Sequence, residues 1–111
     1  MLKEMKLLTL REVCNELGVS RRAVQGYESL GLVQATSKNK YGYLLYDEVM
    51  VEQIRIVKMY RDLGFSGKET KRLLESGEIE QKEMLKMRLL ALKENLKDYE
   101  QKIILVEKLL N

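Results

Sequence analysis

The segment Leu10–Tyr27 predicts two short helices joined by a tight turn. Thr9 and Glu12 can form a capping box at the start of the first helix, because each side chain can accept the other residue's backbone N–H. Gly18 can take the left-handed conformation that ends this helix, and Ser20 can cap the second one. The first helix has an apolar stripe at helical spacing, which we expect to be buried: Leu10, Val13, Cys14 and Leu17. The pattern indicates a helix-turn-helix.

The predicted second helix has one apolar and one polar face. The inward face consists of Ala23, Val24 and Tyr27. The opposite face, near the helix start, holds Arg21, Arg22 and Gln25. Arginine and glutamine can read guanine and adenine through paired hydrogen bonds, so we expect Arg21 and Gln25 to face DNA bases.

Composition supports a DNA ligand and argues against other functions. The formal net charge is +3, and residues 1–45 hold the basic excess, with seven basic and four acidic side chains. The chain has no His and one Cys, which excludes an internal disulfide and the usual metal sites. We expect no enzyme and no cofactor, because no nucleophile stands beside a base. No apolar run reaches the ~20 residues of a membrane span, so we expect a cytoplasmic protein.

The segment Leu32–Tyr46 predicts a β-hairpin with a polar tip at Ser37–Lys40, which would form a wing beside the second helix. Two cations and two phenols lie close together along it, a composition that suits phosphate contact: Lys38, Lys40, Tyr41 and Tyr43. A solvated tip is the alternative for the lysines, and packing on the core is the alternative for Tyr43 and Tyr46.

Two further helices are predicted after the wing. Asp47 can cap a helix that runs to about Leu63, and Gly64 ends it. Ser66 and Glu69 then form a second predicted capping box, which opens a short helix through Leu74 that Gly77 closes.

The chain resembles the MerR-type transcription regulators in three blocks, Val19–Val33, Gly42–Tyr46 and Leu63–Glu69. The resemblance implies a homodimeric winged-helix regulator that binds a pseudo-palindromic promoter site and distorts it, with RNA polymerase as a further candidate partner. It also implies that Arg22 contacts the DNA backbone and that Tyr27 lies beside the DNA. Ser66 takes the place of a polar residue near the flanking phosphates.

Three residues depart from the family pattern. Family members commonly carry a basic residue at Gln25, an aromatic one at Gly26 and an arginine at Leu44. A glycine inside a helix costs about 1 kcal/mol relative to alanine. Gly26 therefore indicates either close approach to a DNA backbone or a tolerated helix defect.

The last segment predicts one long helix from about Glu80 to Leu110. Its apolar residues alternate in steps of four and three, as in a coiled-coil seam: Leu85, Leu89, Leu92, Leu96, Tyr99, Ile103, Val106 and Leu110. We expect this seam to form a homodimer interface, with packing on its own domain as the alternative. The expected domains are a DNA-binding domain at residues 1–78 and a dimerisation helix at residues 79–111.

The charges beside the seam predict an antiparallel pair. With Leu85 at a d position, Lys86 and Lys93 occupy e positions before the midpoint, and Glu100 and Glu107 occupy e positions after it. In an antiparallel pair e faces e, so both lysines meet glutamates of the partner, whereas a parallel pair brings Arg88 near a lysine.

The predicted fold is therefore mainly α: a winged helix-turn-helix, a helix pair and a C-terminal dimerisation helix. We expect a short regulator without an effector-binding domain. The alternative function is a coiled-coil protein-interaction module that docks through the helix-turn-helix. The candidate DNA-binding residues are Ser20, Arg21, Arg22, Gln25, Gly26, Tyr27, Lys38, Lys40, Tyr41, Tyr43 and Ser66.

Overall fold

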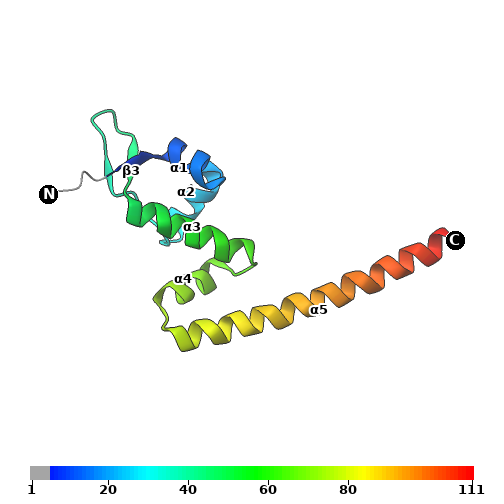
Figure 1. Ribbon diagram of the computed structural model, residues 1–111. Helices are drawn as coiled ribbons and strands as arrows, with labels where there is room; N and C mark the ends of the chain where they lie inside the picture. Colours follow the sequence, from blue (N-terminus) through cyan, green and yellow to red (C-terminus); the bar gives the residue numbers. More distant parts are fainter. Residues whose placement is uncertain (1–5) are drawn as a thin grey trace. The chain divides into compact units, whose positions relative to one another are not determined.

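The protein is described by a computed structural model that covers residues 6–111 (Figure 1). The chain divides into two compact units, of which the first ends at Lys71 and the second runs from Arg72 to Asn111. The described part is mainly helical with one small sheet, as the sequence predicts. Its elements are β1 Leu8–Thr9, α1 Leu10–Leu17, α2 Arg21–Ser29, β2 Ser37–Lys38, β3 Leu44–Tyr46, α3 Glu48–Asp62, α4 Gly67–Glu75 and α5 Glu78–Leu110.

The predicted caps of the helix-turn-helix are confirmed. The Thr9 hydroxyl accepts from the Glu12 backbone N–H at 3.3 Å, and the Glu12 carboxylate accepts from the Thr9 N–H at 3.1 Å. Gly18 has a left-handed φ of 63°. The Ser20 hydroxyl accepts from the Ala23 N–H at 3.0 Å. These local bonds fix where α1 ends and α2 begins.

The apolar stripe of α1 is less buried than the sequence predicts. Val13 is fully buried, but Leu10, Cys14 and Leu17 are only partly covered. The helix has eight residues and lies at the surface of a small unit, so neighbours surround only the centre of its stripe. On α2, Val24 and Tyr27 are buried as predicted.

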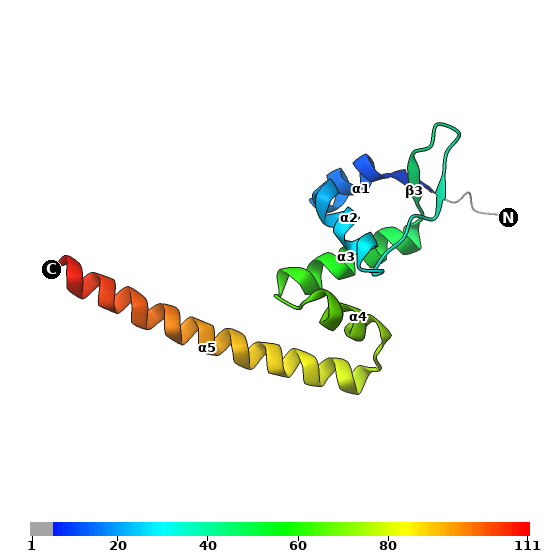
Figure 2. The same ribbon diagram turned by 180° about the vertical axis from the view of Figure 1, so that it is seen from behind.

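The sheet has three antiparallel strands in the order β1-β3-β2, although the sequence predicts only the hairpin of β2 and β3. Leu8 of β1 pairs with Tyr46, and Lys38 of β2 pairs with Leu44. Ser37 and Lys38 belong to a strand, so the predicted tip at 37–40 is wrong by two residues at its start. The hairpin projects beyond β3, away from α3, in both views (Figures 1 and 2).

The core of the first unit lies between the sheet, the helix-turn-helix and α3. Its buried apolar residues are Leu8, Val13, Val19, Val24, Tyr27, Leu32, Val33, Tyr46, Ile54, Val57 and Phe65. Contacts join α1 to α2 and α2 to α3, and both α1 and α3 contact β3, so the two helices of the motif are held on a fixed support.

The helices after the wing follow their predicted caps. The Asp47 carboxylate accepts from the Met50 N–H at 2.8 Å, and Gly64 has a φ of 96° just after α3. The Ser66 hydroxyl accepts from the Glu69 N–H at 3.1 Å, and the Glu69 carboxylate accepts from the Ser66 N–H at 2.9 Å. The second capping box is therefore confirmed, and α4 ends one residue later than predicted.

The last helix, α5, has 33 residues, begins two residues before its predicted start and is about 50 Å long at 1.5 Å per residue. None of its residues is buried. Within residues 6–111, no helix combines the length and the apolar character needed to cross a membrane.

Candidate nucleic-acid interface

The outward face of α2 presents its polar side chains to solvent. Arg21, Arg22, Gln25 and Gly26 are all exposed. Arg21 and Arg22 lie in the first turn, and their side chains make no ion pair or hydrogen bond within the described part of the chain. Their guanidinium groups are therefore available to an external acceptor.

Gly26 lies on the same face, one turn after Arg22. A Cβ built at this position would meet no atom within 4 Å. The fold itself therefore does not require glycine here, and an added methyl group would point into solvent.

Tyr27 belongs to the opposite face, as the apolar pattern predicts. Its side chain is 8% exposed, so the ring packs in the core and little of it can touch a DNA strand. Burial raises the pKa of the Tyr27 hydroxyl, and the nearby Asp62 carboxylate adds to the effect. Tyr27 therefore packs α2 against the core. The expected contact of Tyr27 with DNA is untested.

The wing tip is ordered by one asparagine. The Asn39 carboxamide oxygen accepts the backbone N–H groups of Tyr41 at 2.9 Å and Tyr43 at 3.0 Å. Gly42 completes the turn with a φ of 85°, a left-handed conformation that favours glycine. The turn therefore presents its side chains from a defined backbone.

Four side chains of the wing are exposed as predicted: Lys38, Lys40, Tyr41 and Tyr43. Tyr41 is 74% exposed and Tyr43 is 64% exposed, which excludes core packing for Tyr43. The Lys40 ammonium lies 5.1 Å from the centre of the Tyr41 ring. The tip thus offers two cations and two phenols to a ligand.

Tyr46 connects the wing to α2 instead of facing solvent. It is fully buried, and its hydroxyl donates a hydrogen bond to the Glu28 carboxylate. Burial raises the pKa of the Tyr46 hydroxyl, and the hydrogen bond and charge of Glu28 add to the shift. The core-packing alternative is correct at this position.

A cleft of about 620 Å³ separates the wing from the first turns of α1 and α2. Its lining residues are Thr9, Leu10, Arg11, Arg21, Gly42, Tyr43 and Leu44. Arg11 cannot be identified from the sequence alone, because nothing local to α1 indicates what this exposed side chain faces. A basic residue in the first turn of a helix is the one available signal, since the helix dipole disfavours it there.

Ser66 lies at the start of α4, where its hydroxyl and backbone both take part in the capping box. Its side chain is exposed. The cap accounts for Ser66 in the fold, and its predicted position near flanking phosphates is untested.

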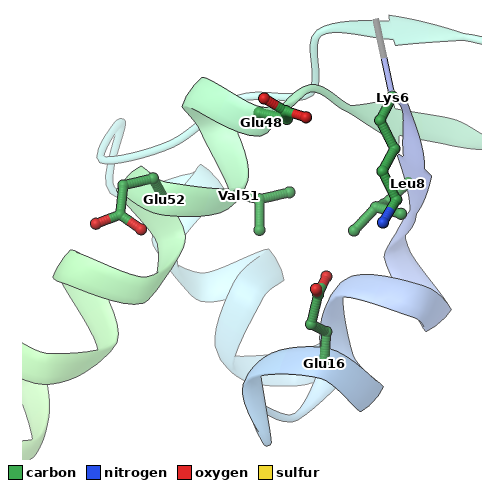
Figure 3. Close-up of a pocket in the computed structure, with 6 residues that line it drawn as sticks. All are labelled: Lys6, Leu8, Glu16, Glu48, Val51 and Glu52. Carbon is green, nitrogen blue, oxygen red and sulfur yellow. The ribbon is translucent and has the colours of Figure 1, made fainter.

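A second pocket of the same unit has the opposite charge (Figure 3). Glu48, Glu52 and Val51 come from α3, Glu16 comes from α1, and Lys6 and Leu8 line the other side. Three carboxylates against one ammonium disfavour a phosphate backbone here. The basic surface of α2 and the wing is therefore the candidate interface. Among residues 6–111, no group of His, Cys, Asp or Glu is placed to hold a metal ion.

The predicted seam of α5 is exposed along its whole length. Its side chains range from 40% exposed at Leu85 and Leu92 to 81% exposed at Leu110. Within the second unit, residues 72–111, no other element buries the seam. Packing on the first unit, the alternative interpretation, is untested. Beside it, Lys93, Glu100 and Glu107 form no ion pair within the described residues.

Comparison with known proteins gives one family. The family described as "MerR HTH family regulatory protein" matches residues 8–77 of the chain. This chain belongs to the MerR family. The residues that match the family run from β1 to just past the end of α4, so they include both α2 and the wing.

The mercuric resistance operon regulatory protein of Bacillus cereus is 30% identical to this MerR-family chain over 63 residues, which is 57% of the chain and 48% of the relative. A second relative, the uncharacterised HTH-type regulator slr0701 of Synechocystis, is 33% identical over 57% of the chain and 46% of its own length. The chain thus spans about half the length of these relatives.

Solved structures share the MerR fold. The N-terminal part of MtaN, a multidrug transporter activator of Bacillus subtilis, has a TM-score of 0.76 at 21% identity, with 93% of this chain and 97% of that chain covered. HiNmlR, a MerR family regulator lacking the sensor domain and bound to promoter DNA, has a TM-score of 0.64 at 18% identity over 85% of this chain and 78% of that one.

Proposed function

We propose that this protein is a homodimeric, sequence-specific DNA-binding transcription regulator. The observation that carries the proposal is the exposed first turn of α2, where Arg21 and Arg22 have no partner in the described part of the chain and Gln25 lies beside them. Membership of a regulator family and the promoter complex of HiNmlR support the same function. Arg21 and Gln25 read bases in the major groove, and Arg22 binds a phosphate.

The wing binds the backbone next to this helix. Lys38 and Lys40 supply point charges, and the exposed hydroxyls of Tyr41 and Tyr43 supply hydrogen bonds to phosphate oxygens. These contacts carry little sequence information, so they fix the position of α2 on the duplex.

The dimer forms through α5. The 33-residue helix α5 contacts α4 only near its start, through Glu80 and Gln81, and has no buried side chain, yet it carries a continuous apolar seam. A second copy covers this seam, and the charges at Lys86, Lys93, Glu100 and Glu107 favour antiparallel pairing. Two symmetric DNA-binding heads then match a pseudo-palindromic site, and binding of both heads distorts the DNA between the half-sites.

Selection of bound sequences from a random DNA pool tests the proposal. We expect an inverted repeat, and we expect affinity to fall steeply as salt rises, because DNA binding releases counterions. Circular-permutation gel mobility on the selected site then measures the bend. Recovery of no preferred sequence, together with salt-independent capture of a protein partner, would instead support the coiled-coil interaction module.

A further inference from the structure

Arg11 is an exposed arginine that the folding of α1 does not explain. It lies in the first turn, where the positive end of the helix dipole disfavours a cation. The neighbouring Glu12 carboxylate is engaged with Thr9, so Arg11 has no ion pair with it. Within residues 6–111, no other group pairs with Arg11 either.

The arginines elsewhere in the chain behave differently. Arg55 pairs with the Glu52 carboxylate, Arg61 donates to the Phe65 carbonyl at 3.1 Å, and Arg72 pairs with the Glu80 carboxylate. Unpartnered arginines are confined to Arg11 and the first turn of α2 in the described part of the chain. An unpaired guanidinium loses no internal hydrogen bond when it binds an external anion.

Arg11 also lines the cleft between the helix-turn-helix and the wing. Arg21 lines the cleft from α2, and Tyr43 lines it from the ordered wing tip. The cleft measures about 620 Å³, which leaves room for a phosphodiester group with its water. Residues from three separate elements thus line one space, and among them are two arginines and one tyrosine.

We propose that Arg11 and Tyr43 bind the same backbone phosphate of the DNA inside this cleft. The inference rests on the proposed function, since the phosphate belongs to the strand that passes between α2 and the wing. Arg11 supplies a planar fork of N–H donors to two phosphate oxygens, and the Tyr43 hydroxyl donates to the same group from the opposite wall. This phosphate fixes the wing relative to α2 on the duplex.

The test compares R11A and R11K with K97A, a matched removal of one exposed charge on α5. Binding to the selected site and to random DNA is measured at several salt concentrations. We expect R11A to weaken both about tenfold and to flatten the log-log salt slope by about 0.9, with the preferred sequence unchanged. R11K keeps the slope but loses part of the affinity, because an ammonium lacks the fork. K97A behaves as wild type.

The pair Arg11 and Tyr43 is tested by a double-mutant cycle. If both bind one phosphate, Y43F weakens binding in the wild-type background and has a smaller effect in R11A. The pair R11A and K38A serves as the control, and its effects should add.

Three results would overturn the inference: an R11A variant that matches K97A, a changed base preference in R11A, or additive effects of R11A and Y43F. A wild-type protein that binds no DNA contradicts the proposed function itself. If wild type binds normally and R11A binds equally well, only the role of Arg11 is contradicted.

Melting temperatures of all variants check that each one folds. R11A should be at least as stable as wild type, because the substitution removes a cation from the start of a helix.

Discussion

At the scale of single residues, some side chains of α2 are explained by the fold, whereas others on its exposed face are not. Ser20 is explained by its bond to the Ala23 N–H, and Val24 and Tyr27 are explained by burial. No such bond or burial accounts for the side chain of Gln25. Because the Gln25 side chain has no structural role in the fold, its substitution tests base recognition without disturbing the helix.

Gln25 should set one base preference in each half-site. Changing Gln25 to Ala removes a side chain that can bond both edge atoms of adenine, so discrimination at that base step should fall by about 1–3 kcal/mol. Selection from a random DNA pool with the Q25A variant measures it. S29A, which alters an exposed residue later in the same helix, is the control and should keep the full preference. An unchanged preference in Q25A would remove Gln25 from the set of base-reading residues.

Gly26 distinguishes close DNA approach from a helix defect. Because a Cβ here meets no atom within 4 Å, G26A should raise the free energy of unfolding by about 0.5–1 kcal/mol. If the DNA backbone approaches Gly26 closely, the same variant binds DNA more weakly. Urea unfolding and DNA titration measure the two effects separately. A more stable variant with wild-type affinity would show that the glycine is a tolerated defect.

At the scale of elements, a polar contact in the core joins α2 to the strand that carries the wing. The buried Tyr46 of β3 donates to Glu28 of α2, so the strand that supports the wing and the recognition helix share one hydrogen bond. Under the proposed function, α2 and the wing approach one DNA strand from different sides, and this hydrogen bond would fix their relative positions.

Loss of the Tyr46 hydroxyl should destabilise the fold and change its response to high pH. Y46F removes the bond to Glu28, which should cost about 1–2 kcal/mol near neutral pH. In wild type the pKa of Tyr46 is raised on folding, so above pH 10 the unfolded chain loses this proton more readily and stability declines. Y46F should decline less steeply between pH 10 and 11. Urea unfolding at pH 8, 10 and 11 measures the free energy of unfolding of wild type and Y46F. If it declines equally with pH in both proteins, the raised pKa of Tyr46 is contradicted.

The wing should contribute charge without sequence readout. Changing Lys38 and Lys40 to Ala should weaken binding to specific and random DNA alike and flatten the log-log salt slope by roughly 0.9 for each phosphate that the variant no longer neutralises. The double variant K82A/K97A on α5 removes the same charge and should leave the slope unchanged. A wild-type slope in K38A/K40A would place the wing away from the DNA backbone.

Local signals predict the elements of this chain well, and long-range features escape them. Both capping boxes are visible in the sequence because their partners lie three residues apart, as Thr9 and Glu12 do. Strand β1 has two residues, and only its pairing with Tyr46 and Leu45 far along the chain makes it a strand. The role proposed for Arg11 likewise depends on a cleft formed by three elements that are distant in sequence.

At the scale of the whole molecule, each part of the chain has a surface that its own fold leaves uncovered. The basic excess lies in residues 1–45 and is presented by α2 and the wing, whereas the pocket between α1 and α3 is acidic. On α5 the uncovered surface is the apolar seam. A nucleic acid suits the first surface and a second copy of the chain suits the last one, so the proposed DNA binding and the proposed dimerisation use separate residues.

The antiparallel pairing of α5 can be tested by charge reversal. Antiparallel pairing in the register with Leu96 opposite the partner's Tyr99 brings Lys86 to the partner's Glu107 and Lys93 to the partner's Glu100. K86E/K93E then places like charges at four contacts and should weaken the dimer by a few tenths of a kcal/mol per contact. Adding E100K/E107K on the same chain should restore it. Sedimentation equilibrium at low salt measures the dimer constants.

A cysteine in place of Asn111 gives a direct geometric control for the same pairing. At 1.5 Å rise per residue, the two C-termini of an antiparallel pair lie on the order of 40 Å apart, so they cannot form a disulfide within the dimer. A parallel pair brings them into contact. N111C in a C14A background, which removes the one native thiol, should therefore stay reduced within the dimer under mild oxidation. Rapid crosslinking at that position would refute the antiparallel arrangement, and with it the location of the two DNA-binding heads at opposite ends of the helix pair.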